Sequence, residues 1–236
     1  MSQLKQTTFP SSGKPASSSK LSWQDFVQLV LDLTVMAYWA MSQDRVASVE
    51  WEENVFTLRL GEDYIRPLAF DNEIPIRAVV RPKAHTDPMR DGMQATIEAK
   101  EIDLELFDIW EREHHKRHFV WEAKRVGDKR VNRAYGNLNS EYVNEGIYRF
   151  IRREYADGLD DAGMLGYVLE GGITNIVNDI NASMGAIRKN PSLSQSNHLR
   201  LVQPITDFEN VYQSRHIRTD NTNIKLHHLF LSFEYN

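Results

Sequence analysis

The sequence predicts an α/β fold in which a central mixed β-sheet is flanked by α-helices. Three segments place apolar residues at helical spacing, and between them lie short runs that alternate or are continuously apolar, as strands are. With 236 residues, the chain is long enough to bury a sizeable core. The order helix, strands, helix, strand, helix, strand is typical of a mixed sheet covered by helices.

Each expected helix carries an apolar stripe that would pack against the sheet. In the first helix, Ser22 and Asp25 form a capping arrangement, and Phe26, Val30 and Leu33 follow at helical spacing. The second helix ends at a turn that contains Gly158. The expected helices cover residues 22–42, 140–155 and 173–187.

The expected strands fall between these helices. A meander of short strands is predicted over residues 46–69, a strand limited by prolines over 74–81, and a long alternating strand over 96–110. A turn at 112–117 would lead into a strand at 118–126. A buried strand at 163–169 and a last strand at 224–235 complete the sheet, with loops at 85–92 and 215–223.

Composition limits the class of protein. The chain is 41% hydrophobic and 26% charged, as is ordinary for a globular protein, and a single domain is expected over residues 21–236. Residues 1–20 have the composition of a disordered tail and lack the apolar core of a signal peptide. No cysteine is present, which excludes disulfides and thiolate ligands and fits a cytoplasmic protein. No segment is apolar enough to suggest a membrane span.

Two charged residues inside an apolar segment are the main functional signal. Glu122 and Lys124 lie two apart in the expected strand at 118–126, so their side chains share one face. A hairpin that turns near residues 112 and 113 pairs residues whose numbers sum to about 225, which places Asp103 opposite Glu122. Asp108 falls on the other face of its strand. Asp103 is therefore preferred to Asp108 as the first metal ligand.

Two carboxylates and a lysine in this arrangement suit metal-assisted phosphodiester hydrolysis. Mg²⁺ or Mn²⁺ prefers oxygen ligands and keeps several waters, so Asp103 and Glu122 with a backbone carbonyl and a substrate phosphate would suffice. Lys124 would orient the attacking water or stabilise charge in the transition state. A Glu and a Lys two apart on a strand also occur as a solvated pair, which is the structural alternative.

The order of an Asp and then Glu-x-Lys on the next strand resembles the PD-(D/E)XK, or restriction-endonuclease-like, nuclease superfamily. The resemblance covers about residues 96–168, and Ile102 stands where that family's motif has proline. It implies a restriction-endonuclease-like core, with Asp103 and Glu122 as metal ligands and Lys124 as the catalytic lysine. An additional acid from the first helix is not identifiable, although Asp25 and Asp32 lie there.

Positive charge gathers beside this motif although the whole chain has a net charge of −5. Such a patch would contact nucleic-acid phosphates, since the overall charge argues against coating by the entire surface. The expected contact residues are Lys116, Arg117, Arg125, Lys129, Arg130 and Arg133.

Other polar residues have structural explanations as well. His114, His115 and His118 are expected in a solvated cationic turn. Residues 212–218 are expected in an ordinary surface loop. Of His227 and His228, which face opposite sides of a strand, one is expected in the core and one at the surface. Arg149, Arg152 and Arg153 form either a solvated helix face or a ridge that follows DNA.

Together these features predict a metal-dependent endonuclease that acts on DNA in preference to RNA. The resemblance adds a role in restriction or phage defence, with a partner protein of such a system, and double-strand cutting would favour a homodimer. The alternative is a catalytically inactive nucleic-acid-binding or assembly subunit with the same fold.

Overall fold

The computed structural model describes residues 21–84, 100–109, 117–189 and 191–235. Its centre is a seven-stranded sheet with the strand order β1-β4-β5-β6-β9-β8-β7, and β2 with β3 forms a separate two-stranded ribbon. The central pairs β5 with β6 and β6 with β9 are parallel, whereas the outer pairs are antiparallel. The expectation of a mixed sheet flanked by helices is confirmed.

The sheet strands have the following bounds: β1 Ile76–Val80, β4 Leu104–Asp108, β5 His118–Val126, β6 Asp161–Val168, β7 Arg200–Val202, β8 Val211–Ile217 and β9 Asn223–Ser232. The ribbon consists of β2 Lys83–Ala84 and β3 Lys100–Glu101. The helical elements are α1 Trp23–Gln43, α2 Glu53–Arg59, η1 Leu60–Ile65, α3 Arg66–Asp71, α5 Tyr135–Glu141, η4 Tyr142–Ile147, α6 Tyr148–Ile151, α7 Ile173–Ala186 and η5 Gln195–Asn197.

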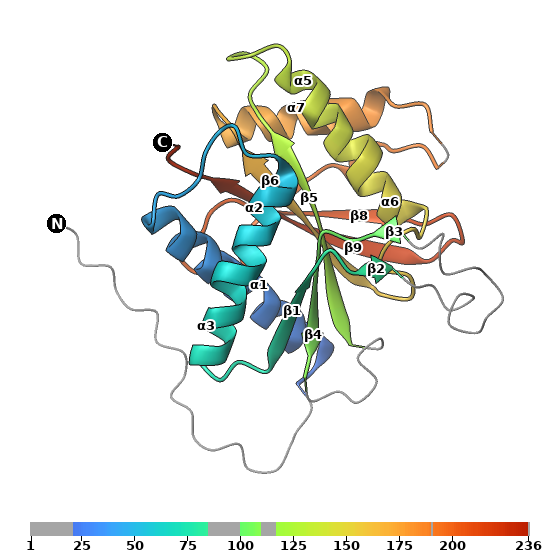
Figure 1. Cartoon of the computed structure of the whole chain (residues 1–236). Coiled ribbons are helices and arrows are strands. Elements are labelled where there is room, and N and C mark those ends of the chain that lie inside the picture. Colours follow the sequence, from blue (N-terminus) through green and yellow to red (C-terminus); the bar gives the residue numbers. More distant parts are fainter. Residues whose placement is uncertain (1–20, 85–99, 110–116, 190, 236) are drawn as a thin grey trace.

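Helices cover both faces of the sheet (Figure 1). On one face α1, α2, η1 and α3 bury a core that includes Phe26, Phe56 and Trp121. On the other face α5, η4, α6 and α7 bury a second core that includes Val120 and Phe230. Neighbouring residues of β5 therefore contribute to different cores, as side chains alternate along a strand.

Helix α1 begins where the sequence predicts. The Ser22 side chain accepts a hydrogen bond from the Asp25 backbone, and the Asp25 side chain accepts one from the Ser22 backbone. This capping box satisfies backbone groups that would otherwise lack partners at the helix start. The expected ranges of β5 and of α7 are also close to those observed.

The expected meander at 46–69 is wrong, because this segment is helical. Phe56, Leu60 and Tyr64 are buried and four residues apart, so they line one side of a helix. The middle of the segment, η1, is a π-helix. The β-branched and aromatic residues of this stretch misled the prediction, since tertiary packing overrides local propensity.

Three further expectations need correction. The second helix starts earlier than expected, at Tyr135, and includes the π-helical segment η4 before it ends at Ile151. Within residues 100–109, the expected long strand divides into β3 and β4, with Ile102 and Asp103 between them. Residues 211–217 form β8 rather than a surface loop. The predicted tail at 1–20 and loop at 85–92 lie outside the described residues.

Candidate active site

Strand β5 places Glu122 and Lys124 side by side. Both face the layer formed by α5, η4 and α6, together with the buried Val120 and Val126. The Lys124 ammonium donates a hydrogen bond of 2.8 Å to Glu122 Oε1 and one of 2.7 Å to the carbonyl of Ala123. Glu122 is 0% exposed and Lys124 is 8% exposed. The alternative of a solvated surface pair is therefore wrong.

Asp103 lies where β4 and β5 separate. The β4–β5 register pairs Leu104 with Trp121 and Glu105 with Val120, so the predicted sum of 225 is confirmed. Asp103 precedes the first paired residue of β4, and its Oδ2 accepts a hydrogen bond of 2.7 Å from the backbone of Ala123. The Asp103 carboxylate thus accepts the hydrogen bond that a backbone carbonyl of β4 would accept if the pairing of β4 with β5 continued to Ala123.

Glu53, in the first turn of α2, is a site residue that the sequence reasoning missed. Its Oε1 accepts a hydrogen bond of 2.9 Å from the Lys124 ammonium, so Lys124 lies between two carboxylates. A helix thus brings a further carboxylate to Lys124, and this helix is α2 rather than α1. The signal was the helical spacing of buried residues after Glu53, in the segment predicted to be strands.

Arg149, on α6, also binds Glu122. Its Nη1 donates a hydrogen bond of 3.0 Å to Glu122 Oε1 and one of 2.6 Å to the Tyr155 hydroxyl. Tyr155 in turn donates to the carbonyl of Glu101 in β3 at 2.5 Å. Both alternatives for Arg149, a solvated helix face and a DNA-tracking ridge shared with Arg152 and Arg153, omitted this inward contact.

The electrostatics of the cluster follow from its burial. Burial, and then the nearby negative charge of Asp103, raises the pKa of Glu122 well above its usual value. Burial also raises the pKa of Glu53. Burial alone would lower the pKa of Lys124, but Glu122 and Glu53 together raise it. Lys124 therefore stays protonated and can act as a hydrogen-bond donor.

One oxygen of Glu122 has no partner. Lys124 and Arg149 both bind Oε1, whereas Oε2 is buried without a hydrogen bond. A buried unpartnered carboxylate oxygen is costly, and a cation is a ligand that would satisfy it. Asp103 and Glu122 thus fit Mg²⁺ or Mn²⁺, which would take its remaining ligands from water and substrate. Within the described ranges, no group of three or more His, Cys, Asp and Glu side chains is placed to hold a metal ion.

The predicted nucleic-acid contacts are in different environments. Arg117 is 9% exposed and binds Asp108 together with the carbonyls of Leu21 and Ser22, so it ties the start of α1 to the sheet. Asp108 is thereby explained as a structural residue. Lys116 lies outside the described residues.

The remaining basic residues follow Lys124 along the chain. Arg125 donates a hydrogen bond of 3.3 Å to the carbonyl of Trp51. Lys129 is exposed and forms an ion pair with Asp179. Arg130 and Arg133 are exposed in the segment between β5 and α5. Of the predicted contacts, these last three are the basic groups best placed to reach a ligand from solution.

Three of the histidines named above lie in the described part of the chain, and all three are buried. His118 lies 3.4 Å from Glu105, so its expected place in a solvated turn is wrong. His114, His115 and residues 112–116 of the expected turn lie outside the described residues. His227 and His228 do face opposite sides of β9, but both are buried, so the expectation that one is exposed is wrong. His227 binds Asp161, and His228 hydrogen-bonds to Tyr142 and Ser214.

No protein-family model, no curated protein and no solved structure matches the chain. The resemblance to PD-(D/E)XK nucleases stays a prediction from the sequence. No helix in the described part of the chain has the length and apolar character needed to cross a membrane.

Proposed function

We propose that this protein is a metal-dependent nuclease of the PD-(D/E)XK type that hydrolyses phosphodiester bonds, with DNA as the preferred substrate. The observation that carries the proposal is the buried, unpartnered Oε2 of Glu122, beside Asp103 and hydrogen-bonded through Oε1 to Lys124. A role in restriction or phage defence follows from the resemblance alone.

Each residue of the cluster has a role in this proposal. Asp103 and Glu122 would hold the cation, and their mutual repulsion favours its binding. A bound Mg²⁺ would make a coordinated water easier to deprotonate and would neutralise charge on the phosphate. Lys124, kept protonated by Glu122 and Glu53, would donate a hydrogen bond to the attacking water or to a phosphate oxygen. Glu53 would fix the position of Lys124.

The alternative function, an inactive nucleic-acid-binding or assembly subunit, has one observation in its favour. Lys124 and Arg149 already place two positive charges on Glu122, as they would in a site that needs no metal. In that case the purified chain would bind nucleic acid without cleaving it, and Mg²⁺ would not bind.

The test is cleavage of plasmid DNA and of RNA with Mg²⁺, Mn²⁺ or a chelator. Glu122→Gln removes the buried charge at nearly constant volume, and Lys124→Met removes the ammonium. We expect each to lower the cleavage rate by about 100-fold or more, since removal of one transition-state donor has effects on this order. Glu141→Gln, which changes an exposed carboxylate on α5, is the matched control.

Two outcomes would contradict the proposal. Cleavage that survives both Glu122→Gln and Lys124→Met would place the chemistry elsewhere. Cleavage that is insensitive to the chelator would remove the metal from the mechanism. Isothermal titration of wild type and Glu122→Gln with Mg²⁺ would show directly whether Glu122 contributes to cation binding.

A further inference from the structure

Arg149 connects the buried carboxylate to the surface. Its side chain is 28% exposed, whereas that of Glu122, to which it binds, is 1% exposed. Among the described basic residues that hydrogen-bond to Glu122, Lys124 is 10% exposed at its side chain, so Arg149 is the more accessible. A ligand that approaches Glu122 from solution would meet the guanidinium first.

The orientation of this guanidinium is fixed by Tyr155. The guanidinium carbon lies 5.3 Å from the centre of the Tyr155 ring, and Nη1 donates to the hydroxyl of the same residue. Tyr155 is itself held, because its hydroxyl donates to the Glu101 carbonyl. Stacking and hydrogen bonding together restrict a side chain that would otherwise lose much rotamer entropy on binding a ligand.

Arg149 retains donors for a further partner. The hydrogen bonds that Arg149 donates to Glu122 and to Tyr155 both use Nη1. Nη2 lies 3.8 Å from Glu145, a distance beyond a hydrogen bond, and the Glu145 side chain is 52% exposed. A guanidinium carries five N–H donors in a planar fork that fits the oxygens of a phosphate.

The charges around Lys124 indicate why a bound phosphate would need the Arg149 guanidinium. Around Lys124 lie three carboxylates, those of Glu53, Asp103 and Glu122, against one ammonium. Such a cluster repels a phosphodiester unless further positive charge is present. A divalent cation would supply part of it, and Arg149 supplies a fixed part on the more exposed side of Glu122.

We propose that Arg149 is a substrate-contacting residue that binds a non-bridging oxygen of the nucleic-acid backbone phosphate at the Glu122 site. This inference rests on the proposed function for the identity of the ligand. It assigns to Arg149 a contact with substrate, whereas Tyr155 is a positioning residue that acts through Arg149.

The competing explanation is that Arg149 only neutralises Glu122. The two explanations differ in what the substitution Arg149→Gln changes. If Arg149 only neutralises Glu122, its removal would strengthen Mg²⁺ binding by removing a competing cation and would leave DNA affinity unchanged. If Arg149 binds phosphate, DNA affinity falls and so does its dependence on salt.

The experiment measures binding of a fluorescent DNA duplex in Mg²⁺, in a Lys124→Met background so that the DNA stays intact. We expect Arg149→Gln to weaken binding by about 10-fold and to lower the slope of log K against log salt by about one. The matched control is Arg45→Gln, which removes the same charge from an exposed arginine paired with Glu234 and placed in none of the proposed contacts. It should change affinity by less than about twofold.

Arg149→Lys is the second variant. It keeps the charge but loses the planar fork, so we expect it to restore the salt slope while the cleavage rate, measured with Lys124 intact, stays at least about 10-fold below wild type. Circular dichroism and thermal unfolding check that each variant is folded. A folded Arg149→Lys variant keeps the test informative if Arg149→Gln does not fold.

The outcomes separate this inference from the nuclease proposal. Equal DNA affinity and salt slope with and without Arg149 would overturn the inference, and cleavage by the wild type would then leave the nuclease proposal intact. Arg149-dependent binding by a chain that cleaves nothing would support the phosphate contact and reject the nuclease. A chain that binds no DNA under any of these conditions would overturn the inference.

Discussion

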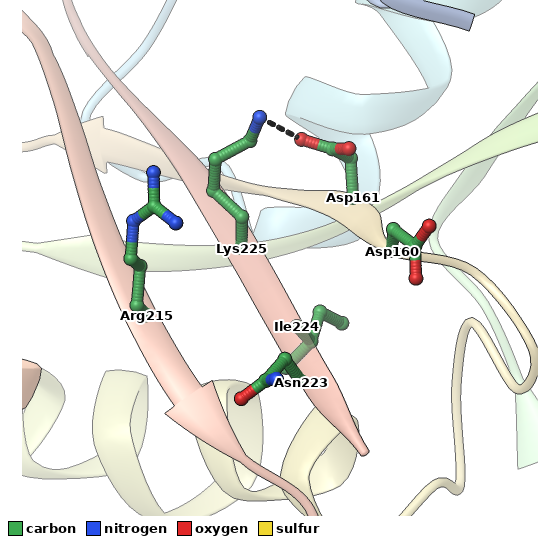
Figure 2. Close-up of a pocket in the computed structure, with 6 residues that line it drawn as sticks. All are labelled: Asp160, Asp161, Arg215, Asn223, Ile224 and Lys225. Atoms are coloured by element: carbon green, nitrogen blue, oxygen red, sulfur yellow. Dashed lines mark ion pairs between the residues drawn. The ribbon is translucent and has the colours of Figure 1, made fainter.

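Glu122 and Asp161 are buried carboxylates on neighbouring strands of the same sheet, and they differ in how fully they are hydrogen-bonded. Asp161 accepts hydrogen bonds from the Trp23 indole at 2.8 Å and the His227 ring at 2.8 Å, and it forms an ion pair of 2.6 Å with Lys225. Figure 2 shows this ion pair at the wall of a cavity of about 350 Å³. Both oxygens of Asp161 have partners, whereas Glu122 Oε2 has none.

The pKa values of the two groups move in opposite directions. Burial alone would raise the pKa of Asp161, but the bonds from His227, Lys225 and Trp23 lower it to about 2. Burial and Asp103 raise the pKa of Glu122. The comparison teaches that burial does not by itself mark a functional carboxylate. A carboxylate whose two oxygens both have partners is structural, whereas one that keeps an unpartnered oxygen is available to a ligand.

The largest effect on stability is expected at Asp161. Asp161→Asn keeps the volume but leaves Lys225 and His227 without their counter-charge. Because the Lys225 side chain is 29% exposed and can turn to water, we expect a loss of about 2 kcal/mol, below the value for a fully enclosed pair. Urea denaturation measures it, with the exposed Asp160→Asn as control. An unchanged midpoint would show that Asp161 is not a structural anchor.

A smaller effect is expected at Glu122, because two contributions oppose each other. Glu122→Gln removes the cost of burying a carboxylate, but it also leaves Lys124 and Arg149 without their counter-charge, so we expect the free energy of unfolding to change by less than about 1 kcal/mol. Cleavage should fall by about 100-fold or more. The same denaturation experiment tests this, with Glu141→Gln as control. A clear loss of stability in Glu122→Gln would mean that Lys124 and Arg149 satisfy the charge, and the contrast with Asp161 would disappear.

The smallest expected effect is the change with pH in the free energy of unfolding of each variant relative to wild type. Asp161 has a folded pKa of about 2 against an ordinary value of 3.8, so its stabilisation is present above pH 3.8 and is lost as the pH falls toward 2. Glu122 has a folded pKa above its ordinary 4.5, so its ionisation lowers stability as the pH rises from 4.5 through the folded pKa.

On acidification, wild type should therefore gain stability relative to Glu122→Gln while the pH is still above 4.5, and the deficit of Asp161→Asn should close only below pH 3.8. His216 and His228, whose pKa values burial lowers, remain in every variant, so their acid destabilisation cancels in these differences. Urea denaturation of wild type, Glu122→Gln and Asp161→Asn across this pH range shows at which pH each stability difference changes. If the Asp161→Asn difference changed at the higher pH, the assignment of Asp161 as structural and of Glu122 as available to a ligand would be refuted.

Much of the site could be predicted because it depends on strand geometry. The alternation of β5 fixed which face Glu122 and Lys124 share, and the hairpin register brought Asp103 to the same place. Glu53 could not be found in this way: helical spacing after Glu53 indicates the helix α2, but no local signal shows how α2 packs on the sheet. Arg149 is likewise brought to Glu122 by tertiary packing across the helical layer.

Strand β8 was missed for a different reason. Its Ser214 and His216 are polar but buried, and Ser214 hydrogen-bonds to His216 and to His228 of the neighbouring strand β9. The prediction assumed that alternating polar residues face solvent. A buried hydrogen-bond network gives the same pattern in the sequence, so composition alone does not separate a surface loop from such a strand.

The π-helical segment η4 has a consequence for the evolution of this chain. A π-helical turn contains one residue more than an α-helical turn, and η4 lies directly before Arg149 in the chain. Deletion of one residue within η4 would restore α-helical winding, and because the wider π-helical turn is what absorbs the extra residue, the residues after it would keep their orientation. Arg149 would then still face Glu122, whereas the same deletion in a regular α-helix would rotate the following residues by about 100°. In homologous chains, a one-residue change in the length of η4 should thus be compatible with retention of this arginine.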